Sequence, residues 1–569
     1  MRKGLPMIVL SLLLIIVPAL MVFGQTGVTE EKYSLWVGGH YTDLTDYAKK
    51  VGEYNLDKDE FVPELKFDYY MRGNGQIFSL YGHYYDEKNA RGELSTIVGD
   101  RFKADIRYRS MLHRKGQDLL TNLETREAGG GKILTHEILD PRADYNVHRK
   151  EIQTDVEILL AREHNLKLIA AHRTILQTGT EQKIGATHCF SCHVTSQSAT
   201  VDKVSHQIIA ALQGEIGRNT VGYEFGYRIF ESKAPEVGAY FDPAVHPVTG
   251  ASGAEFSSRM IYSDTILPIG TYPKTEKMSH KVRIKGDLGK GKYAGSLSYS
   301  EATNRKTDLS STAWVGSFNY AWPLNQKTRL IARVTGTRLR ADDPFIDLPL
   351  FRAGRGGPQI DFSFTRWSSL DRADARGSLE LISRLTKKTT ASVMLEYDRI
   401  DRYDYPEADG LTTNRFIGQV KMQYRKGLKY ATTVKYRFEK TSDPFVSGRG
   451  LFERPGRDEL EQLVPGFAFI FYFQREDLRY QTITSLPTDE HIFEWSSTWR
   501  PDKKINLTVG LKGKYDKNGD LDSLDVNHLS LQPNLAVNLI PSPKWAVTLG
   551  GTHAYFKSRG PVTVALFDG

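Results

Sequence analysis

The residues with the clearest chemical potential form the segment Cys189-Phe190-Ser191-Cys192-His193. Two thiols at this spacing, followed directly by an imidazole, make the C-x-x-C-H pattern of c-type haem attachment. The thiols can bond the two vinyl groups on one porphyrin edge, and the adjacent imidazole can then bind the iron. The chain has only 2 Cys and 15 His, so a chance match has odds on the order of one in ten thousand. The pattern predicts one covalent haem c, attached through Cys189 and Cys192, with His193 as the proximal iron ligand.

Three other chemistries use cysteine pairs, and two of them need features that the sequence does not offer. A disulfide is the ordinary use of two cysteines in an exported chain. A thioredoxin-like dithiol needs a βαβ setting, and a zinc site needs further thiolate or imidazole ligands at suitable spacing. The sequence offers neither, so haem attachment remains the main interpretation.

The ligand on the other side of the iron is predicted from the residues after the motif. Val204, Ile208 and Leu212, with Ala211, recur at helical spacing, which favours a short amphipathic helix. Residues 179–213 are therefore predicted to form a small haem-binding insert, with His206 as the first candidate for the distal ligand. The further candidates are His188, His172 and His164. No Met lies near the motif, so ligation by two histidines and a fairly low potential are expected.

The N-terminus has the layout of a secretory signal peptide. Arg2 and Lys3 precede an apolar run from Ile8 to Phe23, and Gly24 follows it, so residues 1–24 are predicted to be the signal peptide. A retained anchor helix is the alternative, although the run is short and contains Pro18. Beyond it no stretch has the roughly 20 apolar residues of a membrane helix, and the mean hydropathy is −0.42. A helical membrane protein is excluded.

Alternation of apolar and polar residues recurs along nearly the whole remaining chain. Leu65, Phe67, Tyr69 and Met71 alternate with polar residues, and a Gly-Asn-Gly turn at 73–75 leads to a second alternating run, which is a hairpin signature. The same period of two predicts strands in the segments 102–109, 221–229, 314–322, 430–439, 493–499 and 505–511.

These strands carry many aromatic residues on one face and many charges on the other. The chain contains 29 Tyr and 26 Phe, and 25% of its residues are charged. Lipid outside and water inside explain both features, so residues 25–569 are predicted to form an all-β, large transmembrane antiparallel β-barrel of about 22–26 strands in the bacterial outer membrane. Long polar segments near 124–150, 231–281, 341–369 and 442–461 are expected to be loops outside the bilayer. A soluble solenoid or propeller is the alternative, but no fixed repeat period appears.

The formal net charge of +8 is spread along the sequence. Nucleic-acid-binding domains concentrate their basic residues in a patch or stripe. No nucleic-acid partner is predicted.

Several segments of the second half resemble the outer-membrane barrels of the MtrB/PioB type. The resemblance begins with a loop containing Leu267-Pro268 and Tyr272-Pro273, which leads into Lys281–Gly286. It continues through Tyr293–Tyr299, Trp322-Pro323, Thr328–Leu330, Arg384–Lys387, Ala391–Arg399 and Arg500–Leu511, with Tyr515-Asp516. It runs from about Tyr262 onward. One departure is that some family members carry a C-x-x-C pair near the N-terminus with no haem, whereas here the pair lies inside the chain and precedes His193.

The resemblance implies a sheath around a multihaem c-type cytochrome that carries electrons across the outer membrane. Its expected partners are that cytochrome, a periplasmic electron carrier and outer-membrane lipid. A diffusion porin or substrate channel with a structural or sensory haem is the alternative function. An enzyme such as a peroxidase needs an open distal site with an acid–base group, which the sequence does not place, so an electron-transfer role is favoured over catalysis.

Overall fold

The alternating sequence folds into strands along the whole described chain. A computed structural model describes residues 28–43, 52–54, 61–128, 131–186, 192–241, 265–347, 351–352, 359–360, 364–365, 370–403, 412–444, 486–519 and 526–560. The predicted signal peptide lies outside these ranges. Every described segment for which the sequence predicts a strand is a strand, because alternating side chains place the apolar residues on one face and the polar residues on the other.

The predicted hairpin shows how local sequence sets the register. Strand β2 (Phe61–Gly73) and strand β3 (Gln76–Tyr84) pair antiparallel, with Gly73 opposite Gln76. Asn74 and Gly75 have φ angles of 39° and 78°, and a two-residue turn with two positive φ angles is the type that matches strand twist. Asn and Gly tolerate this conformation best, so the turn residues fix the pairing.

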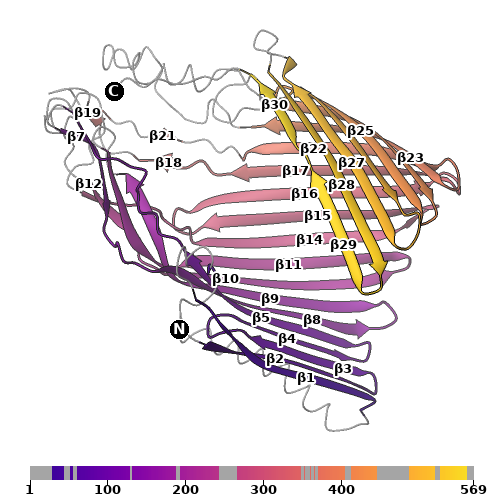
Figure 1. Cartoon of the computed structure of the whole chain (residues 1–569), viewed down its shortest axis with the longest axis horizontal. Coiled ribbons are helices and arrows are strands. Elements are labelled where there is room, and N and C mark those ends of the chain that lie inside the picture. Colours follow the sequence, from indigo (N-terminus) through magenta and orange to yellow (C-terminus); the bar gives the residue numbers. More distant parts are fainter. Residues whose placement is uncertain are drawn as a thin grey trace. The chain divides into compact units, whose positions relative to one another are not determined.

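The first compact unit comprises residues 1–281, 300–310 and 349–361. Its main strands run side by side (Figure 1) and pair in the order β1–β2–β3–β4–β5–β8–β9–β10–β11. Their bounds are β1 Glu30–Tyr41, β4 Ala90–Val98, β5 Phe102–Lys115, β6 Arg126–Ala128, β7 Gly131–Ile138, β8 Tyr145–Ala161, β9 Leu166–Ala186, β10 Cys192–Ile216, β11 Asn219–Ser232, β12 Gly238–Phe241 and β13 Thr265–Pro268. Two short strands of a later segment, β19 Phe351–Arg352 and β20 Gln359–Ile360, pair with each other.

The second unit comprises residues 282–299, 311–348 and 362–569. Its strands pair consecutively from β16 to β17, then β22 to β28, and β28 pairs with both β29 and β30. Their bounds are β16 Leu309–Pro323, β17 Thr328–Ala341, β18 Phe345–Ile346, β21 Phe364–Thr365, β22 Arg372–Arg384, β23 Thr389–Arg402, β24 Thr412–Lys426, β25 Tyr430–Ser442, β26 Asp489–Trp499, β27 Ile505–Lys517, β28 Asn527–Ser542, β29 Trp545–Thr552 and β30 Tyr555–Arg559. The division between the units crosses β14 (Thr275–Leu288) and β15 (Gly291–Asn304).

The predicted all-β class is confirmed. In the described ranges, 24 strands take part in the main sheet, within the predicted range of 22–26. The pairings of the main sheet named above are antiparallel, whereas β7 pairs with β10 in parallel. The polar segments expected to be loops are partly ordered as strands, since β6 and β7 lie in the first of them and β12 and β13 in the second.

Each unit has an apolar face, which is exposed in the second unit and which in the first unit runs from an exposed edge to the buried Ile106. In the first unit, register partners line up Tyr33, Tyr69, Leu80, Leu94 and Ile106 across five strands. At the edge of that face, Tyr33 is 82% exposed. In the second unit the same alignment runs through Leu381, Val393, Val420, Tyr436 and Phe493, which are 40–52% exposed. Continuous exposed apolar faces of this kind need an apolar neighbour, which lipid supplies.

The two ends of the strands differ in how they are connected. In each unit one end, here called the turn end, has short connections such as 74–75, 162–165, 217–218, 385–388, 427–429 and 500–504. The other end, here called the loop end, has most of the long connections, such as 42–60, 116–144, 342–371 and 443–488. Outer-membrane barrels have short turns on the periplasmic side and long loops outside.

The prediction of a small haem-binding insert over 179–213, with a helix after the motif, is wrong. Residues 179–186 end β9 and residues 192–213 lie in β10, two strands of 21 and 25 residues that pair along their length. The spacing of four between Val204, Ile208 and Leu212 misled the sequence interpretation, because it places residues on one face of a strand as well as one face of a helix. The motif therefore belongs to a long hairpin that continues the sheet.

Candidate functional site

The described part of the predicted haem-attachment motif lies at the loop end, at the start of β10. Cys189 and His188 fall outside the described residues. Cys192 is the first residue of β10, and His193 follows it. The pairing of β9 with β10 sets this position, because Ala186 of β9 is the register partner of Val194 of β10.

His193 lies beside β7, the strand that approaches β10 in parallel. His193 is the register partner of Thr135, and its Nε2 lies 3.5 Å from Oε2 of Glu137, with 19% of the His193 side chain exposed. An iron atom bound to Nε2 would take the place of that contact, and the Glu137 side chain is 56% exposed, which leaves it room to turn away. The proximal role of His193 stays a prediction.

The predicted distal ligand His206 does not lie near His193, and this prediction is wrong. Both residues belong to β10, and 13 residues of strand span roughly 40 Å at about 3.3 Å per residue. An odd separation also places them on opposite faces of the strand. On β9, His172 is the register partner of Ile208, and His164 lies in the turn before that strand, at its far end. Both are therefore remote from His193 as well. Of the four candidates only His188 remains, outside the described residues.

The structure instead brings two of these histidines together. The rings of His172 and His206 stack with centroids 6.3 Å apart, and the Thr174 hydroxyl lies 3.0 Å from Nε2 of His172 and 2.9 Å from Nδ1 of His206. The two histidines lie on the apolar face of β9 and β10. His172 is the register partner of Ile208, so the two side chains lie on the same face of the sheet. Sequence spacing alone could not pair them, since the contact depends on the β9–β10 register.

A second polar cluster joins β9 to a distant loop. Glu181 contacts Lys115, Lys183 and Lys203 at 3.2, 3.1 and 3.6 Å and accepts a hydrogen bond from the Tyr272 hydroxyl. The Lys203 ammonium lies 3.9 Å from the centroid of the Tyr272 ring, a cation–π arrangement. Tyr272 stands in the loop before β14, so the cluster ties that loop to β9 and β10.

This cluster lies beyond the apolar band. The face of β9 that carries Leu168 and Leu176 continues with Thr178, Thr180 and Gln182, which lipid would not favour. Burial raises the pKa of Glu181, but the hydrogen bonds from Tyr272, Lys183 and Lys115 and the charge of Lys203 outweigh it, and they lower the pKa to about 2. Glu181 is therefore charged at any physiological pH.

The depressed pKa predicts a pH-dependent contribution to stability. A carboxyl whose pKa falls on folding stabilises the protein above its unfolded pKa, and this stability is lost as the pH drops through the folded value. We expect Glu181→Gln to lower the free energy of unfolding by about 1–2 kcal/mol at pH 7, discounted for solvent screening. Urea titrations of both proteins should show the difference shrinking between about pH 4.5 and pH 2. A difference that stays constant over this range would contradict the assignment.

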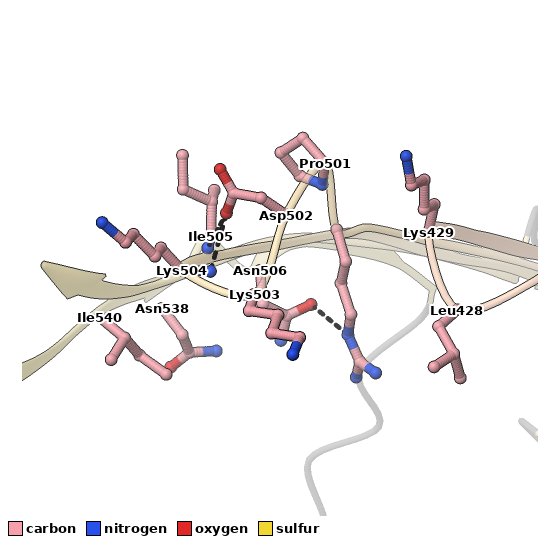
Figure 2. Close-up of a pocket in the computed structure, with 11 residues that line it drawn as sticks. Leu428, Lys429, Pro501, Asp502, Lys503, Lys504, Ile505, Asn506, Asn538 and Ile540 are labelled. Carbon is pink, nitrogen blue, oxygen red and sulfur yellow. Dashed lines mark hydrogen bonds between the residues drawn. The ribbon is translucent and has the colours of Figure 1, made fainter. Parts of the chain in front are cut away.

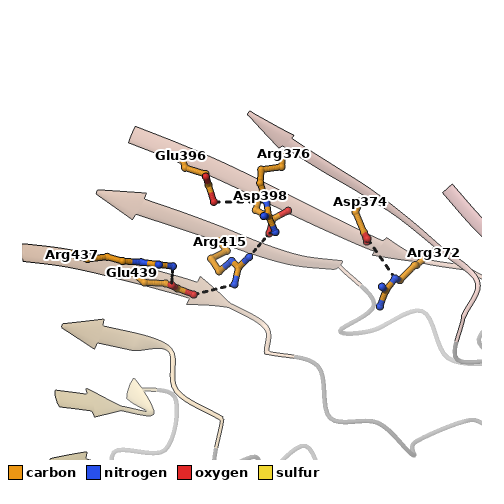
Figure 3. Close-up of polar contacts among 8 residues, drawn as sticks. All are labelled: Arg372, Asp374, Arg376, Glu396, Asp398, Arg415, Arg437 and Glu439. Carbon is orange, nitrogen blue, oxygen red and sulfur yellow. Dashed lines mark hydrogen bonds and ion pairs between the residues drawn. The ribbon is translucent and has the colours of Figure 1, made fainter. Parts of the chain in front are cut away.

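The face of the second unit's sheet opposite its apolar face carries a ladder of ion pairs (Figure 3), here called the charged face. Asp398 lies between Arg376 and Arg415, with Oδ2 at 3.0 and 2.6 Å from their Nη2 atoms. Arg415 also contacts Glu439 at 3.3 Å, and Glu439 contacts Arg437 at 2.7 Å. The Asp398 side chain is only 3% exposed, so it is the most enclosed group of these pairs.

The charged face continues across the next strands. Lys435 pairs with Glu494 at 2.9 Å, and Lys514 pairs with Glu490 at 2.5 Å and with Asp516 at 3.2 Å. The His528 Nδ1 lies 2.6 Å from Asp516. Cross-strand register brings these charges together, and no linear motif in the sequence marks them. A surface of alternating charges is one that water wets and lipid does not.

The described ranges lack two other kinds of feature. No group of three or more His, Cys, Asp or Glu residues there could hold a metal ion. None of the described helices is long and apolar enough to cross a membrane.

No family model and no curated protein matches the chain. Among solved structures, it is similar to a ferric enterobactin receptor (PfeA) mutant from Pseudomonas aeruginosa, with a TM-score of 0.48 and 7% identity over 92% of this chain and 75% of that one. It is also similar to the FrpB iron transporter from Neisseria meningitidis (F3-3 variant), with a TM-score of 0.46 and 10% identity over 95% and 79% of the two chains. At these values the likeness says nothing about substrate or partner.

Proposed function

We propose that this chain is a β-barrel of the bacterial outer membrane that forms a water-filled channel for solutes and carries one covalent haem c at its loop end. The observation that supports a channel is that the sheet of the second unit has one apolar face and one charged face. Its apolar face aligns Leu381, Val393 and Val420, and its charged face aligns Asp398 with Arg415 on the same strands. A strand set with lipid on one side and water on the other is the design of outer-membrane channels.

The location follows from the same faces. Strands can cross a bilayer only where their backbone groups are paired with each other, and strands of 13–15 residues such as β22, β23 and β24 exceed the 9–11 that a crossing needs. The turn end then faces the periplasm and the loop end faces outward. This orientation would put Cys192 and His193 on the outer side.

The haem proposal rests on the C-x-x-C-H pattern and on the place of His193 at the start of β10. When bound, haem c would supply one-electron redox chemistry. Cys189 and Cys192 would hold the porphyrin, and His193 would bind the iron. In a channel the group would have a structural or sensory role, which needs no further cofactor.

An electron conduit of the MtrB/PioB type is the second candidate, and the haem motif is the observation that favours it. One haem at the loop end cannot bridge the roughly 30 Å of the bilayer. This function therefore requires a multihaem c-type cytochrome as partner and a periplasmic electron carrier. Purification from the native membrane in mild detergent should yield a second haem-staining chain if the conduit exists, and this chain alone if it does not.

The proposed location is tested by membrane fractionation. We expect the protein in the outer-membrane fraction, with heat-modifiable mobility on gels and a circular dichroism spectrum dominated by β-structure. A supporting measurement is swelling of liposomes that contain the purified protein in a small neutral sugar. Recovery of the protein from the periplasm without detergent would contradict the proposal.

A further inference from the structure

A cavity of about 520 Å³ lies at the turn end of the second unit. It is formed by the turn 427–429, the turn 500–504 and the end of β28 (Figure 2). Asn506 and Asn538, two of its lining residues, are register partners. Asn506 lies on the same face of β27 as Lys514 and Asp516, because all occupy even-numbered positions of one strand. The cavity therefore opens on the charged face, where solutes of the proposed channel would pass.

The lining has an excess of positive charge. Asp502 is the one carboxylate among the lining residues. Four lining residues are cationic, namely Lys429, Arg500, Lys503 and Lys504. Asp502 is already engaged, because its Oδ1 accepts hydrogen bonds from the backbone N–H groups of Lys504 and Ile505 at 2.7 and 3.0 Å. In the described part of the chain, none of the four cations has a carboxylate within ion-pair distance. Lys503 points to the same side of the strands as Asn506, whereas Lys429 points to the other side (Figure 2). Lys503 and Arg500, which donates to Asn506, are therefore the cations that a ligand beside Asn506 could contact.

The amide side chains of the cavity also present donors. The Asn506 Oδ1 accepts a hydrogen bond from Arg500 Nε at 3.0 Å, and the Asn538 Oδ1 accepts one from the Thr548 hydroxyl at 2.7 Å. With both oxygens engaged, the NH₂ groups of Asn506 and Asn538 are left to donate. The Nη groups of Arg500 add two further donor positions. Donors and cations without competing acceptors favour an anion.

The walls of the cavity are apolar. Leu428 is 87% exposed and Ile540 is 44% exposed, and both point to the same side of the strands as Asn506 and Asn538 (Figure 2). Exposed apolar side chains beside a cationic group suit a ligand that has both an anionic end and an apolar body. A bare inorganic anion would leave these side chains in water.

We propose that this cavity binds a small organic anion with an apolar body, such as an aromatic or aliphatic carboxylate. The proposal rests on the proposed channel, for which it names a class of solute. Arg500 and Lys503 would pair with the carboxylate, Asn506 and Asn538 would donate to it, and Leu428 and Ile540 would contact the apolar body.

The test measures equilibrium binding of benzoate to the full chain in detergent by isothermal titration calorimetry. Benzyl alcohol, which lacks the charge, and acetate, which lacks the ring, are the matched ligands. We expect benzoate to bind at least about 10-fold more tightly than either one. The double variant Arg500→Gln with Lys503→Gln should weaken benzoate binding by about 10-fold or more, since it removes both cations that pair with the carboxylate.

The control variant is Lys387→Gln with Lys388→Gln, which removes two cations from the turn between β22 and β23 at the same end of the sheet. It should bind benzoate like the unmodified protein, and both variants should keep heat-modifiable mobility as evidence of folding. Equal weakening in both variants would show non-specific attraction and overturn the proposal. Equal binding of benzoate and benzyl alcohol, or of benzoate and acetate, would overturn it as well. Binding in detergent does not require a conducting channel, so this result is independent of the proposed function.

Discussion

Replacing Cys189 and Cys192 together by alanine is expected to remove all covalently bound haem from this chain. Both thioether bonds need a cysteine sulfur, and the chain has no other cysteine. The intact mass of the mature protein should fall to that of the polypeptide alone, and haem staining of denaturing gels should vanish. Either single variant can keep one thioether bond and should retain part of the stain. Full retention of the added mass in the double variant would contradict haem attachment at this motif.

The matched control for that experiment is His206→Ala. His206 lies on the same strand as His193 but roughly 40 Å away, so the haem spectrum of this variant should equal that of the unmodified protein. A change from low-spin to high-spin ferric iron in His206→Ala would mean that β10 is not the continuous strand described here. His188→Ala, by contrast, would change the spin state if His188 is the distal ligand.

The second large effect is expected at Asp398. Asp398→Ala removes the carboxylate shared by Arg376 and Arg415 and leaves their charges on a crowded surface. Breaking a buried ion pair destabilises by about 3–5 kcal/mol when the remaining charge is fully enclosed. The two arginine side chains are 50% and 31% exposed, and Arg415 keeps Glu439, so we expect about 2 kcal/mol. Urea unfolding in lipid vesicles, followed by tryptophan fluorescence, measures it.

Asp401→Ala is the control for this ion pair. Asp401 belongs to the same strand and pairs with Arg399 at 2.9 Å, but that pair is more exposed. Exposed ion pairs contribute little because water screens them, so the variant should unfold close to the unmodified protein. If Asp398→Ala unfolds no more easily than Asp401→Ala, the ladder on the charged face is not the structural element described here.

Strand positions could be predicted from the sequence because period-2 alternation is a local property. The β2–β3 hairpin was predictable to the residue, since Asn74 and Gly75 favour the turn that fixes its register. The strand β10 could not be predicted in this way, because the spacing of four between Val204, Ile208 and Leu212 fits both a helix and a strand. Only pairing with β9 and β11 decides between them.

The candidate sites were predictable only where their residues are adjacent in sequence. The haem motif is one short segment, so its residues could be named. The Glu181–Tyr272 contact joins residues 91 positions apart, and the pairing of Asp398 with Arg415 depends on the register of β23 and β24. Strand register outside tight hairpins is set by the whole sheet, and single residues do not encode it.

The most direct test of the central claim is single-channel recording in planar lipid bilayers with the purified chain and no partner protein. A barrel with a wetted charged face should produce stepwise openings of defined conductance that scale with salt concentration. Addition of the Asp398→Ala variant should change the conductance of each step or its noise. Protein that inserts, as shown by protease protection in vesicles, yet gives no current above the detergent blank would contradict the channel. That result would leave the sheath of an electron conduit as the function to test.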